Sequence, residues 1–232
     1  MDIVIIGAGP AGMVTAINAK NKFNNVILIE KNDRIGKKLL ATGNGRCNYT
    51  NLELSRKNYN NTNFVKDTLK DFSNEGLEST TDGKRVYPKT LKANTVLSVL
   101  MYWLSKKEID IRTNTEVKLV EKNKNTFTVL TDKESTKADI VIFSAGAKSM
   151  PSSGSDGKSF KILENLGVKI TDLKPALTQI KLDSKYLKHL SGTKVIGNVK
   201  FYKEDKKIDE RSGEILFTNY GISGPPILDL SV

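Results

Sequence analysis

The sequence predicts an α/β protein whose first part is a Rossmann-like dinucleotide-binding domain built on a parallel sheet. Two short apolar runs, Ile3–Ile6 and Val26–Ile29, flank a segment with helical spacing over Ala11–Lys22. A strand, a helix and a second strand within about 30 residues form the repeat of parallel sheets. Both apolar runs are continuous rather than alternating, which is typical of strands buried on both faces.

The next segments are a loop and a helix. Lys31–Asn63 is polar with little periodicity, which predicts a long loop with at most one helical turn. Phe64–Asn74 is a candidate helix, and Asp82–Lys89 is typical of a turn followed by a short strand. Ala93–Lys107 is the clearest helix. Its apolar side chains share one face: Val96, Leu97, Leu100 and Leu104.

Strand patterns return after this helix. Ile109–Arg112 predicts a strand, and the alternating segments Val117–Lys122 and Thr126–Thr131 predict an antiparallel pair, a β-meander inserted in the α/β pattern. Ala138–Gly146 predicts a buried strand that ends in small residues. Asp156–Val168 predicts a helix closed by a glycine at position 167.

A β-rich pattern replaces the α/β pattern around Lys169–Pro175, where we place a domain boundary. The strand-like segments that follow are 168–173, 177–182, 194–203 and 213–218. The sequence therefore predicts a dinucleotide-binding domain over residues 1–170 and a partial β-rich domain over residues 171–232.

Composition excludes several classes of protein. The single cysteine, Cys47, rules out an internal disulfide and a cysteine-based zinc site, and the single His189 gives no other support for a metal. No apolar run is long enough for a membrane span or a signal peptide, so the expected location is the cytoplasm. The net charge of +11 is typical of a lysine-rich solvated surface, and it also suits an anionic cofactor or nucleic acid.

Three glycines provide the first functional signal. Gly7, Gly9 and Gly12 form G-x-G-x-x-G between the first strand and the first helix. This turn lets a pyrophosphate approach the backbone amides at the helix N-terminus. Glu30 ends the second strand, where a carboxylate accepts hydrogen bonds from ribose hydroxyls and disfavours a 2′-phosphate. The alternative is that the three glycines form only a tight turn between strand and helix, that Glu30 is an ordinary surface residue, and that no ligand binds there.

NAD and FAD both use this motif, and three features favour FAD. A long loop rich in small residues follows the second strand, a β-meander interrupts the α/β pattern, and the strand near residue 143 ends in a small-residue segment. These features are typical of flavoproteins that bind two dinucleotides.

Longer motifs resemble one family. Segment 36–51, "GKKLLATGNGRCNYTN", is similar to the signature of the BaiN/YhiN-like NAD(P)/FAD-dependent oxidoreductases, also called aminoacetone-oxidase-type flavoproteins. The similarity continues in family order through "GKRVYPKTLKANTVLSVL", "VIFSAGAKSMPSSGSDG", "LGVKITDLKPAL" and "GEILFTNYGISGPPILDLS". It therefore extends over nearly the whole chain.

The resemblance implies FAD in an extended pose. It implies a set of cofactor-binding residues: Gly7, Gly9, Pro10, Ala11, Gly12, Glu30, Lys31, Lys38, Gly43, Arg46, Cys47, Asn48, Val117, Ala145 and Gly146. Within this set, Glu30 and Lys31 would flank the adenosine ribose, and the backbone of Val117 would contact adenine. Five residues of the set would line the cofactor toward its flavin end: Lys38, Gly43, Arg46, Cys47 and Asn48.

The chain departs from the family pattern at two places. Ser144–Ala147 stands where the family usually has "ATGG", so a glycine is replaced at Ala147. Family members also run on past the position of Val232 and return to the cofactor domain. We therefore expect the chain to be truncated at its C-terminus, without the return segment that covers the flavin.

The sequence thus favours an FAD-dependent oxidoreductase that takes hydride from a reduced nicotinamide or a small organic substrate. It identifies no catalytic acid or base, and Cys47, which lacks a partner thiol, is expected to pack rather than react. Gly221–Pro225 nearly matches a hydrolase nucleophile elbow, but we interpret Pro225 as the first residue of a helix.

Two other classes stay open. One is an RNA-modifying flavoprotein, favoured by the charge but not by the dispersed lysines or the lack of an aromatic platform. The other is a fragment that cannot retain FAD. The substrate, the choice between NADH and NADPH, and the oligomeric state are not predicted.

Overall fold

The computed structural model describes residues 1–55, 59, 61, 63–66 and 76–231. The chain separates into two units, Met1–Ile170 and Thr171–Val232. Within the described residues, no helix has the length and apolar character needed to cross a bilayer.

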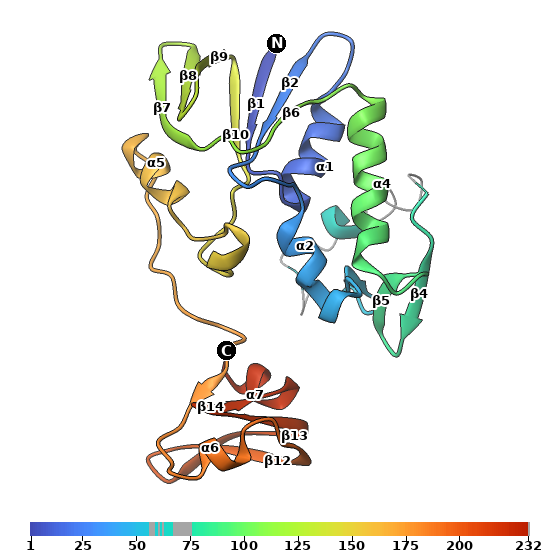
Figure 1. Cartoon of the computed structure of the whole chain (residues 1–232), viewed down its shortest axis with the longest axis vertical. Coiled ribbons are helices and arrows are strands. Elements are labelled where there is room, and N and C mark those ends of the chain that lie inside the picture. The colour runs from blue at the N-terminus through green and yellow to red at the C-terminus, as the bar shows by residue number, and fades with distance from the viewer. Residues whose placement is uncertain (56–58, 60, 62, 67–75, 232) are drawn as a thin grey trace. The chain divides into compact units, whose positions relative to one another are not determined.

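A four-stranded parallel sheet is the centre of the first unit (Figure 1). Its strand order is β10-β1-β2-β6, with bounds Ile140–Phe143, Asp2–Ile6, Asn25–Ile29 and Asp110–Arg112. Helix α1, Pro10–Ala19, connects β1 to β2, and helix α4, Ala93–Lys106, precedes β6. This arrangement confirms the predicted α/β class and the Rossmann-like start.

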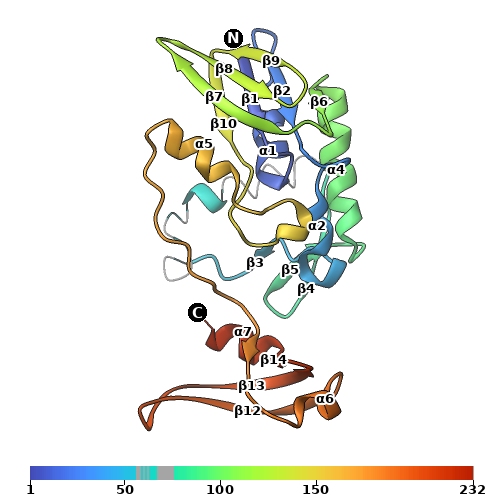
Figure 2. The same ribbon diagram turned by 60° about the vertical axis from the view of Figure 1, so that its left-hand side comes forward.

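Both faces of the sheet are covered, which explains the continuous apolar runs in the sequence. Ile3 and Ile5 pack with the buried faces of α1 and α4. Val4 and Ile6 point the other way and pack with Val120 of the β-meander. Figures 1 and 2 show α1 and α4 side by side on one face of the sheet. Because side chains alternate along a strand, a strand between two layers needs apolar residues at every position.

The β-meander has one strand more than the sequence predicted. Strands β7, β8 and β9, with bounds Val117–Asn123, Thr126–Thr131 and Ser135–Ala138, form an antiparallel sheet. The predicted strand Ala138–Gly146 is therefore too long, because β9 ends at Ala138 and β10 covers only Ile140–Phe143. It is also less buried than predicted, since β10 is the edge strand and Ile140 is 38% exposed.

The segment after β2 is more ordered than the predicted loop. It contains helix α2, Lys37–Ala41, the 3-10 helix η1, Thr42–Gly45, and strand β3, Thr50–Asn51. Strand β3 joins a small antiparallel sheet with β4, Ser79–Asp82, and β5, Arg85–Pro88. The order comes from tertiary contacts, because Leu39 is buried in the core and the Gly36 N–H donates to the Ala8 carbonyl at 3.0 Å.

The remaining helices of the unit are short. Residues 63–66 are helical, and the rest of the helix predicted over Phe64–Asn74 lies outside the described residues. The 3-10 helix η2 covers Pro151–Ser153, and α5 covers Ser159–Asn165. Gly167, with φ of 82°, follows α5, and the Val168 N–H donates to the Leu163 carbonyl at 3.0 Å. This is the glycine C-terminal cap that the sequence predicted.

The second unit is an antiparallel sheet with the order β11-β14-β13-β12. The strands are Ile180–Lys181, Gly221–Ser223, Lys206–Thr218 and Lys194–Lys203 in that order, and the two longest form a hairpin (Figure 2). Helix α6 covers Leu187–Leu190, and α7 covers Pro225–Leu230 and so begins at the predicted proline. The strand predicted over residues 168–173 is wrong, because this segment forms no ladder there.

Candidate functional site

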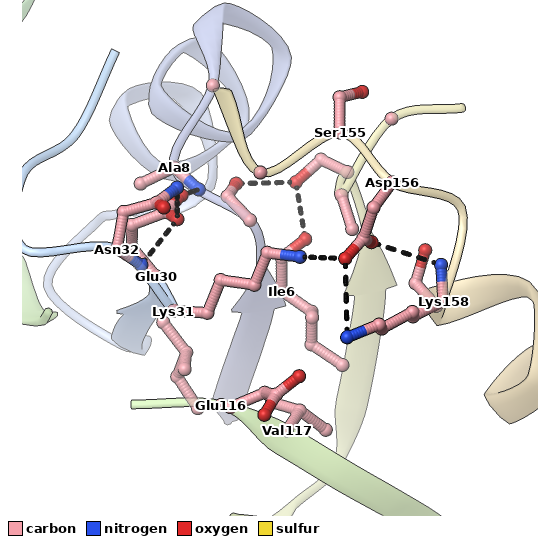
Figure 3. Close-up of a pocket in the computed structure, with 18 of the residues that line it drawn as sticks. Ile6, Ala8, Glu30, Lys31, Asn32, Glu116, Val117, Ser155, Asp156 and Lys158 are labelled. Carbon is pink, nitrogen blue, oxygen red and sulfur yellow. Dashed lines mark hydrogen bonds and ion pairs between the residues drawn. The ribbon is translucent and has the colours of Figure 1, made fainter. Parts of the chain in front are cut away.

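A cavity of about 480 Å³ opens at the carboxyl ends of β1, β2 and β10 (Figure 3). Parallel strands present their carboxyl ends at one edge, and ligands of open α/β sheets bind outside that edge. The cavity is lined by the glycine turn after β1, the loop after β2, the start of β7, and the segment from β10 to α5. All of these parts belong to the first unit.

The three glycines of the turn meet different surroundings. Gly7 has φ of 99°, and a Cβ there would lie 2.6 Å from Ala145 Cα. A Cβ at Gly12 would collide with the Gly7 carbonyl and lie 2.7 Å from Ser144 Oγ. A Cβ at Gly9 would meet no atom within 4 Å. Gly7 and Gly12 are therefore needed for the fold, whereas Gly9 leaves open space at the N-terminus of α1.

Glu30 is buried and already holds the turn together. Its Oε2 accepts from the Ala8 N–H at 3.0 Å, and its Oε1 accepts from the Asn32 N–H at 2.9 Å and from Asn32 Nδ2 at 2.7 Å. An ionised carboxylate has about four acceptor positions. These contacts fill both positions of Oε1 and one of Oε2, so one acceptor position on Oε2 is left for a ligand hydroxyl.

The cavity wall carries an excess of positive charge. Six lysines and three carboxylates line it: Lys31, Lys37, Lys38, Lys118, Lys158, Lys161, Glu30, Glu116 and Asp156. Lys38 Nζ donates to the hydroxyls of Ser149 and Ser155, each at 3.1 Å, and no carboxylate of the described residues pairs with it. A lysine that faces only hydroxyl groups is available to an anionic ligand.

Asp156 is the carboxylate on the far wall. Its Oδ2 lies 2.9 Å from Lys31 Nζ and 3.8 Å from Lys158 Nζ, and its Oδ1 accepts from the Lys158 N–H at 3.1 Å. Burial acts to raise the pKa of Asp156, but the hydrogen bonds from Lys31 and the Lys158 amide outweigh it, so the pKa is lowered. Asp156 is therefore ionised at neutral pH.

The segment from β10 to Asp156 forms a wall of the cavity and contacts the glycine turn. Ser144 Oγ lies 3.1 Å from the Ile6 carbonyl and 3.0 Å from the Gly7 carbonyl. A Cβ at Gly146 would lie 2.8 Å from Ser155 Oγ. Ser155 Oγ in turn donates to the Ala147 carbonyl at 2.5 Å, so the backbone of Ala147 contributes to this wall.

The cavity brings together ten of the predicted residues: Gly7, Gly9, Pro10, Ala11, Glu30, Lys31, Lys38, Val117, Ala145 and Gly146. Five others do not line it: Gly12, Gly43, Arg46, Cys47 and Asn48. Gly12 lies in α1 behind the turn, and the other four belong to η1 or directly follow it. A cofactor role of these five stays a prediction.

The residues at η1 have structural contacts of their own. The guanidinium of Arg46 lies 5.2 Å from the centre of the Tyr87 ring. In the orientation that satisfies its amide, Asn48 Nδ2 donates to the carbonyls of Thr50, at 2.9 Å, and Val86, at 3.2 Å. Cys47 is buried in the core, and this burial raises the pKa of its thiol. The thiol is therefore protonated at neutral pH and is a poor nucleophile.

Sequence reasoning missed Asn32, Ser155 and Asp156. Asn32 orients the Glu30 carboxylate, and its Nδ2 lies 3.2 Å from the Ser153 carbonyl across the cavity. Ser155 and Asp156 fall within a motif that suggested the family, but no local pattern distinguishes them from other loop residues. Only the fold brings them to Lys31 and Lys38.

The described residues indicate neither a metal centre nor a nucleophile elbow. Among the described residues, no three histidine, cysteine, aspartate or glutamate side chains form a group that could hold a metal ion. Ser223 of the near-match to a nucleophile elbow is buried in strand β14, and Gly224 is followed directly by α7.

The model of the HI0933-like protein Rossmann domain matches residues 1–223 of the chain. The chain belongs to this family. HI0933-like proteins are the BaiN/YhiN type of FAD-binding oxidoreductase, so the resemblance indicated by the sequence motifs is confirmed.

Three proteins illustrate what this HI0933-like chain is similar to. It is 32% identical to the 3-dehydro-bile acid delta(4,6)-reductase of Clostridium scindens, over 99% of the chain and 59% of that enzyme. It is 28% identical to the ribosomal RNA dihydrouridine synthase of Escherichia coli, over 99% of the chain and 60% of that enzyme. The solved bacillithiol disulfide reductase Bdr (YpdA) of Staphylococcus aureus shares 19% identity, covers 63% of the chain and 38% of its own, and has a TM-score of 0.39. The chain spans about 60% of the curated relatives' length.

Proposed function

We propose that the cavity binds the ADP portion of FAD and that the protein acts as an FAD-dependent oxidoreductase. The observation that carries this proposal is the open space at Gly9, next to the N-terminus of α1 and in the same cavity as Glu30. Family membership supports the same cofactor.

The residues present fit an ADP group. The space at Gly9 admits a pyrophosphate to the free amides of α1, where the helix dipole favours an anion. The remaining acceptor position on Glu30 Oε2 suits one ribose hydroxyl. Lys38 offers a positive charge that faces two serine hydroxyls and pairs with no carboxylate in the part of the chain that the structure describes. The chain thus supplies contacts for the pyrophosphate and for one ribose hydroxyl.

Bound FAD would supply two-electron chemistry, in which hydride comes from a reduced nicotinamide or a small organic substrate. The residues that line the cavity would bind and orient the cofactor and neutralise its phosphates. The reductase activity of the Clostridium scindens relative supports a small-molecule substrate for the whole protein.

A flavin-binding experiment tests the proposal. The purified chain is titrated with FAD, and the bound fraction is measured by absorbance at roughly 370 and 450 nm after dialysis. Gly9→Ala is expected to weaken FAD binding about tenfold or more, because its methyl group would occupy ligand space, with the melting temperature unchanged. Gly197→Ala, in which the added Cβ would make an ordinary 3.5 Å contact in the second unit, is the matched control.

The results of this titration either support or contradict FAD binding at the cavity. Retention of FAD by wild type and by Gly197→Ala, and its loss in Gly9→Ala, support the proposal. Failure of the folded wild-type chain to retain FAD, or equal binding by Gly9→Ala, would contradict it.

A second candidate is a flavoprotein that acts on RNA. Two observations favour it: the net charge of +11, and the similarity to a ribosomal RNA dihydrouridine synthase. Neutralisation of several phosphates releases counterions, so binding to a ribosomal RNA fragment should weaken steeply as salt rises. A labelled RNA hairpin titrated at 50 and 200 mM salt tests this. Absence of binding at the lower salt concentration would remove the candidate.

A further inference from the structure

The loop after β2 and the segment before α5 are connected by three polar contacts across the cavity. Lys31 pairs with Asp156, Asn32 reaches the Ser153 carbonyl, and Lys38 donates to Ser155. Figure 3 shows Lys31 extending from the end of β2 toward Asp156. The partners are more than a hundred residues apart in sequence, so the contacts exist only because the fold brings the two segments together.

Lys31 occupies a position with a known chemical consequence. It directly follows Glu30, which marks the ribose end of the proposed site. In Rossmann proteins a basic residue near the ribose accommodates a 2′-phosphate, whereas the carboxylate at the strand end accepts from a 2′-hydroxyl. Glu30 and Lys31 therefore favour opposite ligands: a free Lys31 would attract the 2′-phosphate that Glu30 repels.

Asp156 removes this conflict. Its ion pair with Lys31 neutralises the ammonium group, and it adds a second negative charge to the lining of the cavity that contains Glu30. We propose that Asp156 is a specificity-determining residue, which holds Lys31 away from the ligand and so restricts the site to dinucleotides with a free 2′-hydroxyl. This inference rests on the proposed function, because it assumes that the cavity binds an adenosine ribose.

The geometry also explains why Asp156 is suited to this role. Its Oδ1 is fixed by the Lys158 N–H at 3.1 Å, so the carboxylate stays aimed at Lys31. The two side chains of the ion pair are only 29% and 23% exposed, so water screens the pair less than it screens a surface pair.

The test uses the full chain and two probes that differ by one phosphate, ADP-ribose and 2′-phospho-ADP-ribose. Both dissociation constants are measured by calorimetry in one buffer. Wild type is expected to prefer ADP-ribose. Asp156→Asn keeps the shape of the side chain and frees the Lys31 charge, so it is expected to shift the ratio of the two constants about tenfold toward the 2′-phosphorylated probe.

Two variants separate this role from a general change in charge. Glu116→Gln removes a different cavity carboxylate, one that pairs with Lys118, and should change the ratio less than twofold. Lys31→Met combined with Asp156→Asn should restore the wild-type ratio, because the freed ammonium is gone. If Asp156→Asn melts early, Asp156→Ser provides the same comparison.

Each outcome has a distinct meaning. An unchanged ratio in a folded Asp156→Asn protein that binds ADP-ribose would overturn the inference and leave the proposed function standing. An equal shift in Glu116→Gln would also overturn it, since the effect would then be general electrostatics. Failure of wild type to bind either ADP-ribose or FAD would overturn the proposed function, and the inference with it.

Discussion

At the scale of single residues, the three glycines of the turn meet different physical requirements. Gly7 and Gly12 pack against backbone atoms, whereas Gly9 faces open space. The first two are therefore needed for the turn to fold, and the third leaves space for the proposed ligand. Glu30 combines both roles, because it ties Ala8 to Asn32 and still keeps one acceptor position.

The stability of glycine variants should follow these surroundings. Gly12→Ala is expected to lower the free energy of unfolding by about 3 kcal/mol, because the new methyl group would collide with the Gly7 carbonyl. Gly9→Ala should change it by less than about 1 kcal/mol. Urea denaturation followed by circular dichroism measures both. Equal urea midpoints for the two variants would contradict the different roles given to Gly12 and Gly9.

The buried thiol of Cys47 should make stability depend on alkaline pH. Burial raises its pKa in the folded protein, so the folded chain keeps the proton that the unfolded chain loses. The contribution is fully present below the unfolded pKa and is lost as pH rises through the folded value. Free energies of unfolding between pH 7 and 10 should fall more steeply for wild type than for Cys47→Ala. Parallel curves would show that the thiol has no such role.

At the scale of elements, the sheet is stabilised by helices that bury a narrow face. In α4, Leu100 is 1% exposed and its neighbour Met101 is 50% exposed. Leu100 lies in the cluster that covers Ile3 and Ile5 of β1, so α4 supports the strand that carries the glycine turn. The packing of α4 therefore acts on the site through β1.

Truncation of the two neighbouring side chains should have unequal effects. Leu100→Ala is expected to cost about 2 to 5 kcal/mol of unfolding free energy, because it leaves a cavity against β1. Met101→Ala should stay within about 0.5 kcal/mol. Thermal and urea denaturation measure the difference. A cost below about 1 kcal/mol for Leu100→Ala would mean that α4 does not stabilise the sheet.

Elements with a strong local pattern could be predicted from the sequence, and those made by tertiary contacts could not. The periodicity of α4 and the apolar runs of β1 and β2 predict those elements because each buries a whole face or both faces. Helix α2 has only Leu39 buried, so its pattern is too weak to separate it from a loop. Segment 168–173 alternates like a strand but forms no ladder, and a strand needs a partner for its backbone groups.

The same limit applies to the candidate site. Gly7, Gly9 and Glu30 could be predicted because the strand, turn and helix are contiguous in sequence. Asp156 and Ser155 could not, because their partners Lys31 and Lys38 are more than a hundred residues away. Arg46, Cys47 and Asn48 directly follow η1, and the packing of Arg46 against the Tyr87 ring is visible only in the structure.

At the scale of the whole molecule, the buried core and the cavity belong to one unit. Both large clusters of buried side chains draw their members from residues up to Ile162, with Leu166 at their edge. The second unit contributes few buried apolar residues: Leu187, Ile215, Pro226 and Ile227. Hydrophobic burial is the main source of stability, so the two units should differ in their ability to fold alone.

A chain of residues 1–170 is therefore expected to fold and to bind ADP-ribose within about threefold of the full chain. Both large clusters of buried side chains lie within it, and every residue that lines the cavity lies between Ile6 and Ile162. A cooperative melting curve tests the folding, and calorimetry tests the binding. Gly9→Ala in the same shortened chain is the control, since it should fold equally well and bind weakly. A shortened chain that folds but does not bind would show that the second unit contributes to the nucleotide site.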